Sequence, residues 1–527
     1  MAENVRERPA TAQPDASGDG VPAGRPALKG LAGQAARVPW CWPALLTLAL
    51  GLYQLGRPEL WRDELASWSF ATRPLPNLIA TVRNTDVSQL AYYLMLHFWI
   101  AAFGDSVEAM RTLSVLAMAA AAACVTLVGR KLAGTRAGLV SGLVFALVPS
   151  VSRFAQEVRF YALEVLVATL ATLLLLRALD RPSVRRWAAY AACLAFLGYI
   201  DLVALSVVAG HAAGAALRWW HDRDNHQFWF VPAAVAGLAA CLLLALLGSA
   251  QAAGQVGWIQ RPGLDLTAFA FFGRNLFYST SVAAVLIVLA VFAWAVAWRE
   301  AAFMTAIAVM PVAAVWLVSQ GPHSYFLPRY LLLTVGAWAI LAGIGLSKVD
   351  VRVAAAVILV VAILGAGDQQ VIREPGAHSW AGYPVGVGGS YLDYAGAAAI
   401  VGREAETGDG IVYSAGSQGW LMIDLGVEYY LKGDLRHGVP APRELFITGM
   451  AAQADHLYPV LCPHPAACLG QEPRIWIVGS GYGKSPDQAV TPAQAALLRQ
   501  HYRLSFIKHV QSLTVFLLLR SPSQARR

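Results

Sequence analysis

Two adjacent carboxylates, Asp63 and Glu64, are the first side chains of this sequence whose type and position could do chemistry. They follow the first long apolar run, 38–55, and the turn 56–58, so we expect them just outside a membrane core. Adjacent carboxylates at a bilayer surface are costly unless they are solvated or paired. One of them could act as a general base that takes a proton from a hydroxyl group. The alternative is a solvated turn that only caps a helix, and these residues alone leave both interpretations open.

The composition indicates a membrane protein that crosses the bilayer many times. Of the 527 residues, 57% are hydrophobic and 14% are charged, and the mean hydropathy is +0.51. Soluble domains have about 25% charged residues. Many apolar runs approach the ~20 residues needed to span a bilayer, and they predict about eleven transmembrane helices within 37–366. The net charge of +8 comes mostly from arginines near membrane ends, so we do not predict nucleic-acid binding.

The two ends of the chain differ in character from this apolar region. Residues 1–36 are rich in Ala, Gly, Pro and Arg and have no apolar period, which predicts a disordered tail. Residues 367–527 contain turn-rich segments, apolar strands such as 410–413 and 474–478, and a helix at 391–403, which predicts a small mixed α/β domain. Arginines gather at alternate ends of the spans and place the tail in the cytoplasm and the α/β domain outside it.

Two of the six cysteines, Cys462 and Cys468, lie in a polar segment of the predicted outer domain. An exported segment permits a disulfide between them. A metal site is the less favoured alternative, because His464 is the only further ligand nearby. The other four cysteines fall in apolar runs and are expected to be small core residues.

The first outer loop, 56–108, contains a third carboxylate, Asp86. Its stretches 75–82 and 90–103 have apolar residues at helical spacing but are poor candidates for spans. They are typical of interfacial helices that lie along the membrane.

Further polar side chains are predicted at the same outer boundary. The second and fifth outer loops contribute Gln156, Glu157, Arg159, Tyr161, His323, Arg329 and Tyr330. Arg62, Arg159 and Arg329 stand on the side where arginine is uncommon, which needs a reason. Arginine binds phosphate through several donors and can stabilise the charge of a phosphate leaving group. The alternative is a set of structural ion pairs, which is stronger for Glu157 than for Arg329, because Arg329 has no adjacent acidic residue.

These motifs resemble the lipid-phosphate-dependent membrane glycosyltransferases of the GT-C fold, and most of all the protein O-mannosyltransferase and aminoarabinose transferase branch of glycosyltransferase family 39. The resemblance covers about 40–345 and rests on 61–64 with Ser67, on Asp86, and on 92–99, 103–106, 110–114, 129–134, 156–161 and 326–330. One departure concerns 87–91, where many members have a proline-rich stretch, so the local backbone there is in doubt.

The resemblance implies an inverting enzyme that moves one sugar, mannose or another, from a polyprenyl-phosphate carrier to an acceptor outside the cell membrane. The acceptor would be a protein, a lipid or a cell-envelope glycan. Asp63 would be the general base, Glu64 would orient it or the acceptor, and Asp86 would be the next candidate. Arg329, with Arg159, would hold the carrier phosphate. Some relatives use a divalent metal, but the chain shows no compact ligand motif, so we predict no obligatory metal or other cofactor.

Two other classes of function remain open at this stage. A transporter or flippase of lipid-linked sugars would also need many spans, but internal repeats or broken central helices are expected of it and no repeat is apparent. A non-catalytic partner in envelope assembly is the third possibility. The sequence does not identify the sugar, the carrier length, the acceptor or the oligomeric state.

Overall fold

The computed structural model describes residues 40–378, 391–414, 416–436 and 438–521, so the predicted tail at 1–36 lies outside the described residues. A helical region is followed by a region of mixed helices and strands. The two regions belong to one compact unit, 40–527, and the domain boundary predicted at 366/367 falls inside helix α17 (Val351–Val371).

The second and third predicted spans form a helical hairpin within α6 (Val107–Leu147). The backbone leaves helical geometry at Ala133 and Gly134, and the chain then reverses, so that Gly138 packs against the backbone of Thr126. Gly134 has a φ of +90°, which a residue with a Cβ adopts only with strain. The glycines on both sides of this turn allow the two helices to approach closely.

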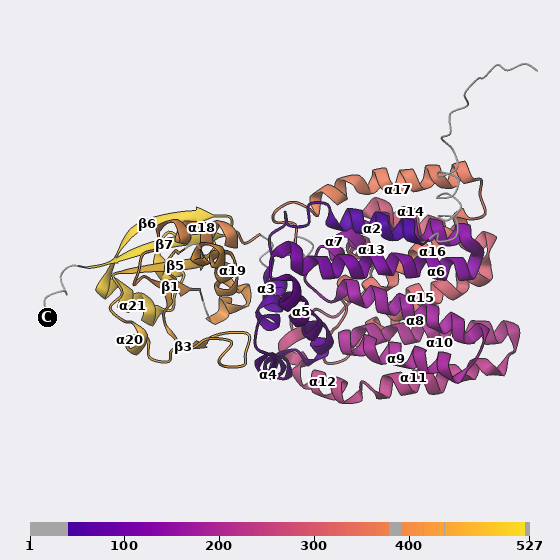
Figure 1. Cartoon of the computed structure of the whole chain (residues 1–527), viewed down its shortest axis with the longest axis horizontal. Coiled ribbons are helices and arrows are strands. Elements are labelled where there is room, and N and C mark those ends of the chain that lie inside the picture. Colours follow the sequence, from indigo (N-terminus) through magenta and orange to yellow (C-terminus); the bar gives the residue numbers. More distant parts are fainter. Residues whose placement is uncertain (1–39, 379–390, 415, 437, 522–527) are drawn as a thin grey trace, which may run out of the picture. The chain divides into compact units, whose positions relative to one another are not determined.

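The other predicted spans also coincide with helices, whose axes run roughly parallel in Figure 1. They are α2 (Cys41–Leu52), α8 (Tyr161–Asp180), α9 (Val184–Ile200), α10 (Val207–Asp222), α11 (Phe230–Ala239), α14 (Thr280–Val296), α15 (Trp298–Val318), α16 (Val335–Leu346) and α17. By length and composition, five of the described helices can cross a membrane, or six if the bent pair 225–256 counts as one span. The count of about eleven crossings therefore stays a prediction.

The first outer loop folds into three helices rather than two. Helices α4 (Leu75–Thr85) and α5 (Leu90–Phe103) cover the stretches predicted to be helical. Helix α3 (Arg62–Ala71) was not predicted, because its few apolar residues show no clear period. Its first turn holds Asp63 and Glu64, and the Trp61 backbone N–H donates to Glu64 Oε2 over 3.4 Å. Carboxylates are favourable at this end of a helix, but Glu64 is fully buried, so the pair does not form the solvated turn of the alternative interpretation.

A five-stranded sheet forms the centre of the C-terminal region. In spatial order its strands are β2 (Arg443–Glu444), β1 (Gly410–Tyr413), β5 (Arg474–Ser480), β7 (Leu513–Arg520) and β6 (Tyr502–Val510). Strand β1 is parallel to β2 and β5, whereas β7 is antiparallel to both of its neighbours.

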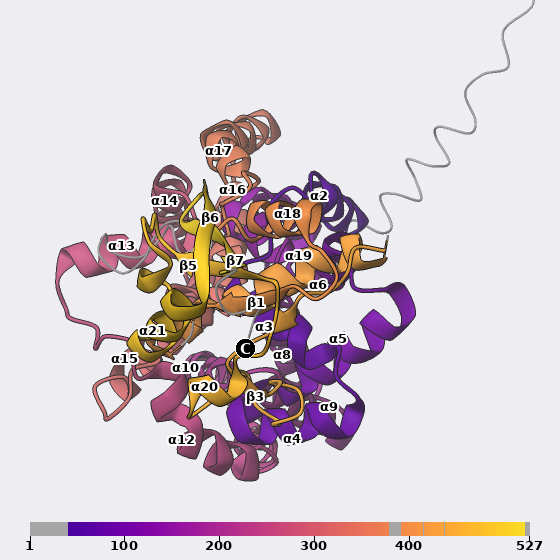
Figure 2. The same ribbon diagram turned by 90° about the vertical axis from the view of Figure 1, so that its left-hand side faces the viewer.

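Helices cover both faces of this sheet, as Figures 1 and 2 show. Trp476 of β5 packs toward α18 (Tyr394–Glu404) and α19 (Ile423–Arg436), whereas Ile477 packs toward α21 (Pro492–His501). Strands covered on both faces are apolar throughout, which explains why they are recognisable in the sequence. The predicted α/β character of this region is confirmed.

Strands β3 (Ile447–Gly449) and β4 (Val460–Leu461) form a separate two-stranded sheet, and in the sequence they lie between β2 and β5 of the main sheet. Directly after β4, Cys462 and Cys468 are joined by a disulfide that closes a short loop around α20 (Pro465–Cys468).

Candidate functional site

A large cavity of about 1730 Å³ lies where the loops that were predicted to be outside the membrane meet. It is bordered by α3, by the turn after α4, by α12 (Leu242–Val256), and by the 3₁₀ helix η4 (Pro328–Thr334). The predicted site residues that line it are Asp63, Asp86, Arg159, Arg329 and Tyr330. The structure thus brings together side chains from three separate outer loops.

Asp63 faces this cavity with 18% of its side chain exposed. Its carboxylate lies 3.4 Å from Arg62 Nε and 3.7 Å from Arg329 Nη2. Burial disfavours the ionised form, but the positive charges of Arg62, then Arg329 and Arg159, outweigh burial. The pKa of Asp63 therefore lies below its ordinary value, and the carboxylate is ionised at neutral pH.

Arg159 is 92% buried, since only 8% of it is exposed, and it also lines the cavity. Its Nη1 donates to the hydroxyls of Ser67 and Tyr93, at a distance of 3.4 Å in each case. Its Nε has no hydrogen-bond partner. No carboxylate of the described residues lies within 4.0 Å of it. A buried guanidinium with spare donors is suited to bind an anion such as phosphate.

Arg329 completes this arrangement from the first turn of η4. Its guanidinium lies over the rings of Trp61 and Tyr330, at 5.6 Å from each centroid. Aromatic faces stabilise a cation where water is scarce. Arg62, Arg159 and Arg329, which stand against the usual arginine distribution, all line this one cavity, and this shared position gives the reason for them.

Glu64 has a different environment from its neighbour. It is fully buried and accepts two hydrogen bonds of 2.9 Å from Arg111 and one of 2.8 Å from the backbone N–H of Val158. Burial raises the pKa of Glu64, but the charge and hydrogen bonds of Arg111 and the hydrogen bond of His378 lower it by more. The pKa of Glu64 therefore lies below its ordinary value. Glu64 does not line the cavity and cannot contact an acceptor there. The geometry supports its other predicted role, holding the helix that carries Asp63.

Asp86 closes the α4 end of the cavity. Its carboxylate accepts hydrogen bonds from the hydroxyls of Ser88 at 2.9 Å and Tyr93 at 2.8 Å. Burial raises its pKa, and the charge of Arg159 opposes this rise. Asp86 therefore shares Tyr93 with Arg159, which links a carboxylate and a guanidinium through one hydroxyl.

Two residues predicted to bind substrate, Gln156 and Glu157, lie away from the cavity. The Gln156 side-chain amide donates to the carbonyl groups of Gly51 and Tyr53 and does not line the cavity. Glu157 accepts from the Trp61 indole at 2.8 Å and pairs with Arg153 at 3.0 Å, and it is also buried away from the cavity. Glu157 thus forms the kind of ion pair that the alternative interpretation expected.

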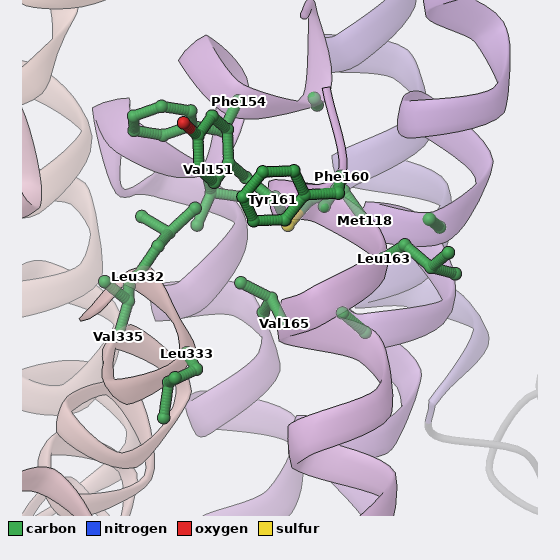
Figure 3. Packing of buried hydrophobic residues seen from close by; sticks show 14 of the residues in the cluster. Met118, Val151, Phe154, Phe160, Tyr161, Leu163, Val165, Leu332, Leu333 and Val335 are labelled. Carbon is green, nitrogen blue, oxygen red and sulfur yellow. The ribbon is translucent and has the colours of Figure 1, made fainter. Parts of the chain in front are cut away.

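Tyr161 and His323 are also outside the cavity lining. Figure 3 shows Tyr161 among the buried apolar side chains at the start of α8, next to Phe160 and Phe154. Its ring belongs to the core cluster, and its centroid lies 6.4 Å from that of the ring of Tyr330, which lines the cavity. His323 lies in the loop before η4, and only the later residues of that loop reach the cavity.

Several residues of the site were not predicted. Arg111 binds Glu64 and three backbone carbonyl groups and lies 3.3 Å from His378 Nδ1. The sequence did contain a signal for Arg111, because an arginine at the end of an apolar span is costly unless it has partners. Trp420, from the 3₁₀ helix η5 (Gly416–Leu421), and Tyr458, from a loop of the same α/β region, line the cavity near Arg62 and carry no sequence motif.

Comparisons with known proteins show which family model and which solved structures this chain is similar to. Residues 88–244 match the family model described as dolichyl-phosphate-mannose-protein mannosyltransferase. The crystal structure of ArnT from Cupriavidus metallidurans in the apo state has a TM-score of 0.59 to this chain at 12% identity, covering 93% of this chain and 98% of that one. The structure of ArnT bound to undecaprenyl phosphate has a TM-score of 0.57 at 12% identity, covering 95% and 99%. A comparison with curated protein sequences finds no match.

The fold is that of a GT-C membrane glycosyltransferase with a C-terminal α/β region, as the sequence motifs predicted. The family model matches less than half of the chain and the solved structures are 12% identical to it, so the likeness they establish is one of fold. The described residues contain no group of three or more His, Cys, Asp or Glu that could hold a metal ion, and independence from metal stays a prediction.

Proposed function

We propose that this protein transfers a single sugar from a polyprenyl-phosphate carrier to a hydroxyl acceptor on the outer side of the membrane, with inversion at the anomeric carbon. The observation that carries the proposal is the meeting of an ionised carboxylate, Asp63, with two cavity arginines, Arg329 and Arg159. A base on the acceptor side and a cation on the leaving-group side are the two elements that such a displacement needs.

In the proposed reaction Asp63 accepts the proton of the acceptor hydroxyl while the hydroxyl oxygen attacks the anomeric carbon. The bond between that carbon and the phosphate oxygen breaks, and its electron pair stays on the phosphate. Arg329 and Arg159 stabilise the charge that develops there through their N–H donors. The proton ends on Asp63, and the carrier leaves as polyprenyl phosphate.

The shape of the cavity supports a lipid donor. Beyond the arginines it is lined by apolar side chains of α13 (Leu266–Phe277) and α15, including Phe272, Val315 and Val318. A polyprenyl chain needs such an apolar path next to the phosphate site, because its own surface avoids water. The loop carboxylate at the outer end of this path favours transfer over transport of the carrier, since transport needs no base.

The direct test is sugar transfer or donor hydrolysis by purified protein in liposomes with radiolabelled undecaprenyl-phosphate mannose and other undecaprenyl-phosphate sugars. Asp63→Asn keeps the shape of the side chain but removes its basic charge, so turnover should fall by about 10²–10⁴-fold while donor binding persists. Glu64→Gln makes the same acid-to-amide exchange at the neighbouring residue. Compared with Asp63→Asn, it should reduce turnover less and reduce stability more.

Retention of wild-type turnover by Asp63→Asn would reject the assignment of the base and would make Asp86 the next variant to test. Movement of the labelled donor between leaflets without release or transfer of its sugar would instead favour a transporter.

A further inference from the structure

Beyond the arginines, the cavity has a second polar corner formed by Asp86 and Asp201. Asp201 follows α9 and accepts a hydrogen bond from the backbone N–H of Val203 at 3.2 Å through Oδ1. Only 6% of Asp201 is exposed, and its Oδ2 has no hydrogen-bond partner. No cationic group of the described residues lies within 4.0 Å of its carboxyl group. A buried carboxyl oxygen without a partner is costly, so a ligand group that donates to it would remove that cost.

This corner is connected to the arginines by hydrogen bonds. Arg159 Nη1 donates to Tyr93, and the Tyr93 hydroxyl donates to Asp86. The Nε of Arg159 is a second buried polar atom without a partner. Unpaired donors and acceptors thus occur together in one corner, which is the pattern expected for a ligand that carries several hydroxyl groups.

We propose that Asp86, Asp201, Tyr93 and Arg159 form the pocket for the sugar of the lipid donor and that this pocket selects a sugar without a carboxylate group. The proposal rests on the function proposed above and adds the chemical class of the donor sugar. A hydroxyl group can both donate to a carboxylate and accept from a guanidinium, so a neutral hexose or pentose satisfies all four side chains.

The charge of the pocket supports this selection. Glu164 of α8 is fully buried, neither of its carboxyl oxygens has a hydrogen-bond partner, and it interacts electrostatically with Asp201. Burial raises the pKa of Asp201 to about 7, so this group can also donate a hydrogen bond in part of its population at neutral pH. Asp86 and Asp201 line the cavity, and a uronic acid would bring a third acidic group to their corner, which is unfavourable.

The test compares ligands that differ only in the sugar. Binding to the purified full chain in nanodiscs is measured for undecaprenyl phosphate alone, for its mannose, glucose and arabinose esters, and for its glucuronic acid ester. At least one neutral ester should bind about tenfold more tightly than the bare carrier, which corresponds to one hydrogen bond to a charged group. The glucuronic acid ester should bind more weakly than the bare carrier.

Asp201→Asn should reduce the preference for the best neutral ester over the bare carrier by about tenfold and should leave binding of the bare carrier unchanged. Asp224→Asn, the same exchange in the exposed loop after α10, is the matched control and should leave the preference unchanged. Equal binding of glucuronic acid and neutral esters, or an unaltered preference in Asp201→Asn, would overturn the proposed pocket. Absence of binding by the bare carrier itself would instead reject the carrier-dependent function, so the two failures are distinguishable.

Discussion

Arg329 Nη2 lies 3.7 Å from Asp63 Oδ2, so the proposed phosphate-binding group and the proposed base form an ion pair. The positive charge of the arginine favours the ionised carboxylate. A phosphate bound to Arg329 would balance part of that positive charge and raise the proton affinity of Asp63. Donor binding would thereby make Asp63 a stronger base at the stage when the acceptor hydroxyl must lose its proton.

This relationship predicts the acid limb of the rate profile. Asp63 acts only when deprotonated, and its pKa in the free enzyme lies below the ordinary value of ~3.9. We expect the acid limb that Asp63 causes in kcat/KM, measured with undecaprenyl-phosphate sugar donors, to lie below about pH 5. Arg329→Ala removes one of the charges that lower the pKa, so the acid limb should move to higher pH in addition to a general loss of rate.

Arg329→Lys is the matched control, because it keeps the charge but loses the planar fork. Its rate should lie between those of the wild type and Arg329→Ala, and its acid limb should stay near the wild-type position. A profile of Arg329→Ala that parallels the wild type at every pH would show that Arg329 does not influence the base.

A second prediction concerns the stability of α3. Removing Arg111 leaves the Glu64 carboxylate buried without its main partner, and breaking a buried pair in this way costs about 3–5 kcal/mol. Arg111→Met should therefore lower the unfolding temperature in detergent by several degrees. The double variant Arg111→Met with Glu64→Gln should recover part of the loss, because no uncompensated charge remains. A single variant as stable as the wild type would contradict the role of this pair.

The third prediction is topological. Arginine asymmetry and an odd number of spans place the tail inside and the α/β region outside. Alkaline phosphatase, which is active only when exported, should be active when fused to the C-terminus, and a cytoplasm-dependent fluorescent protein fused there should be dark. The reverse result would exchange the sides assigned to every loop.

The helical framework was predictable because long apolar runs determine it. Even the hairpin of α6 was indicated by the glycines and basic residues that separate its two apolar halves. The number of crossings was less predictable, since α11 and α12 meet at a bend of 54° and several helices are too short to identify as spans by length.

The site was predictable where a charged residue stands at an outer membrane boundary, as for Asp63, Arg159 and Arg329. Sequence position could not tell which way neighbouring residues point. Asp63 and Glu64 are adjacent, yet the helical twist of α3 turns one to the cavity and the other to Arg111. Contributions from the α/β region, such as Trp420, depend on contacts between distant segments that no local pattern reports.

Arg111 and the backbone N–H of Leu60 also determine when in biosynthesis the site becomes complete. Arg111 contacts His378, and Leu60 donates to the hydroxyl of Tyr430 at 2.8 Å. Both partners are translated after all of the predicted spans, so the segment that begins α3 waits for the last third of the chain before its contacts are formed. A nascent protein whose spans are already inserted therefore lacks these two contacts until His378 and Tyr430 have been synthesised.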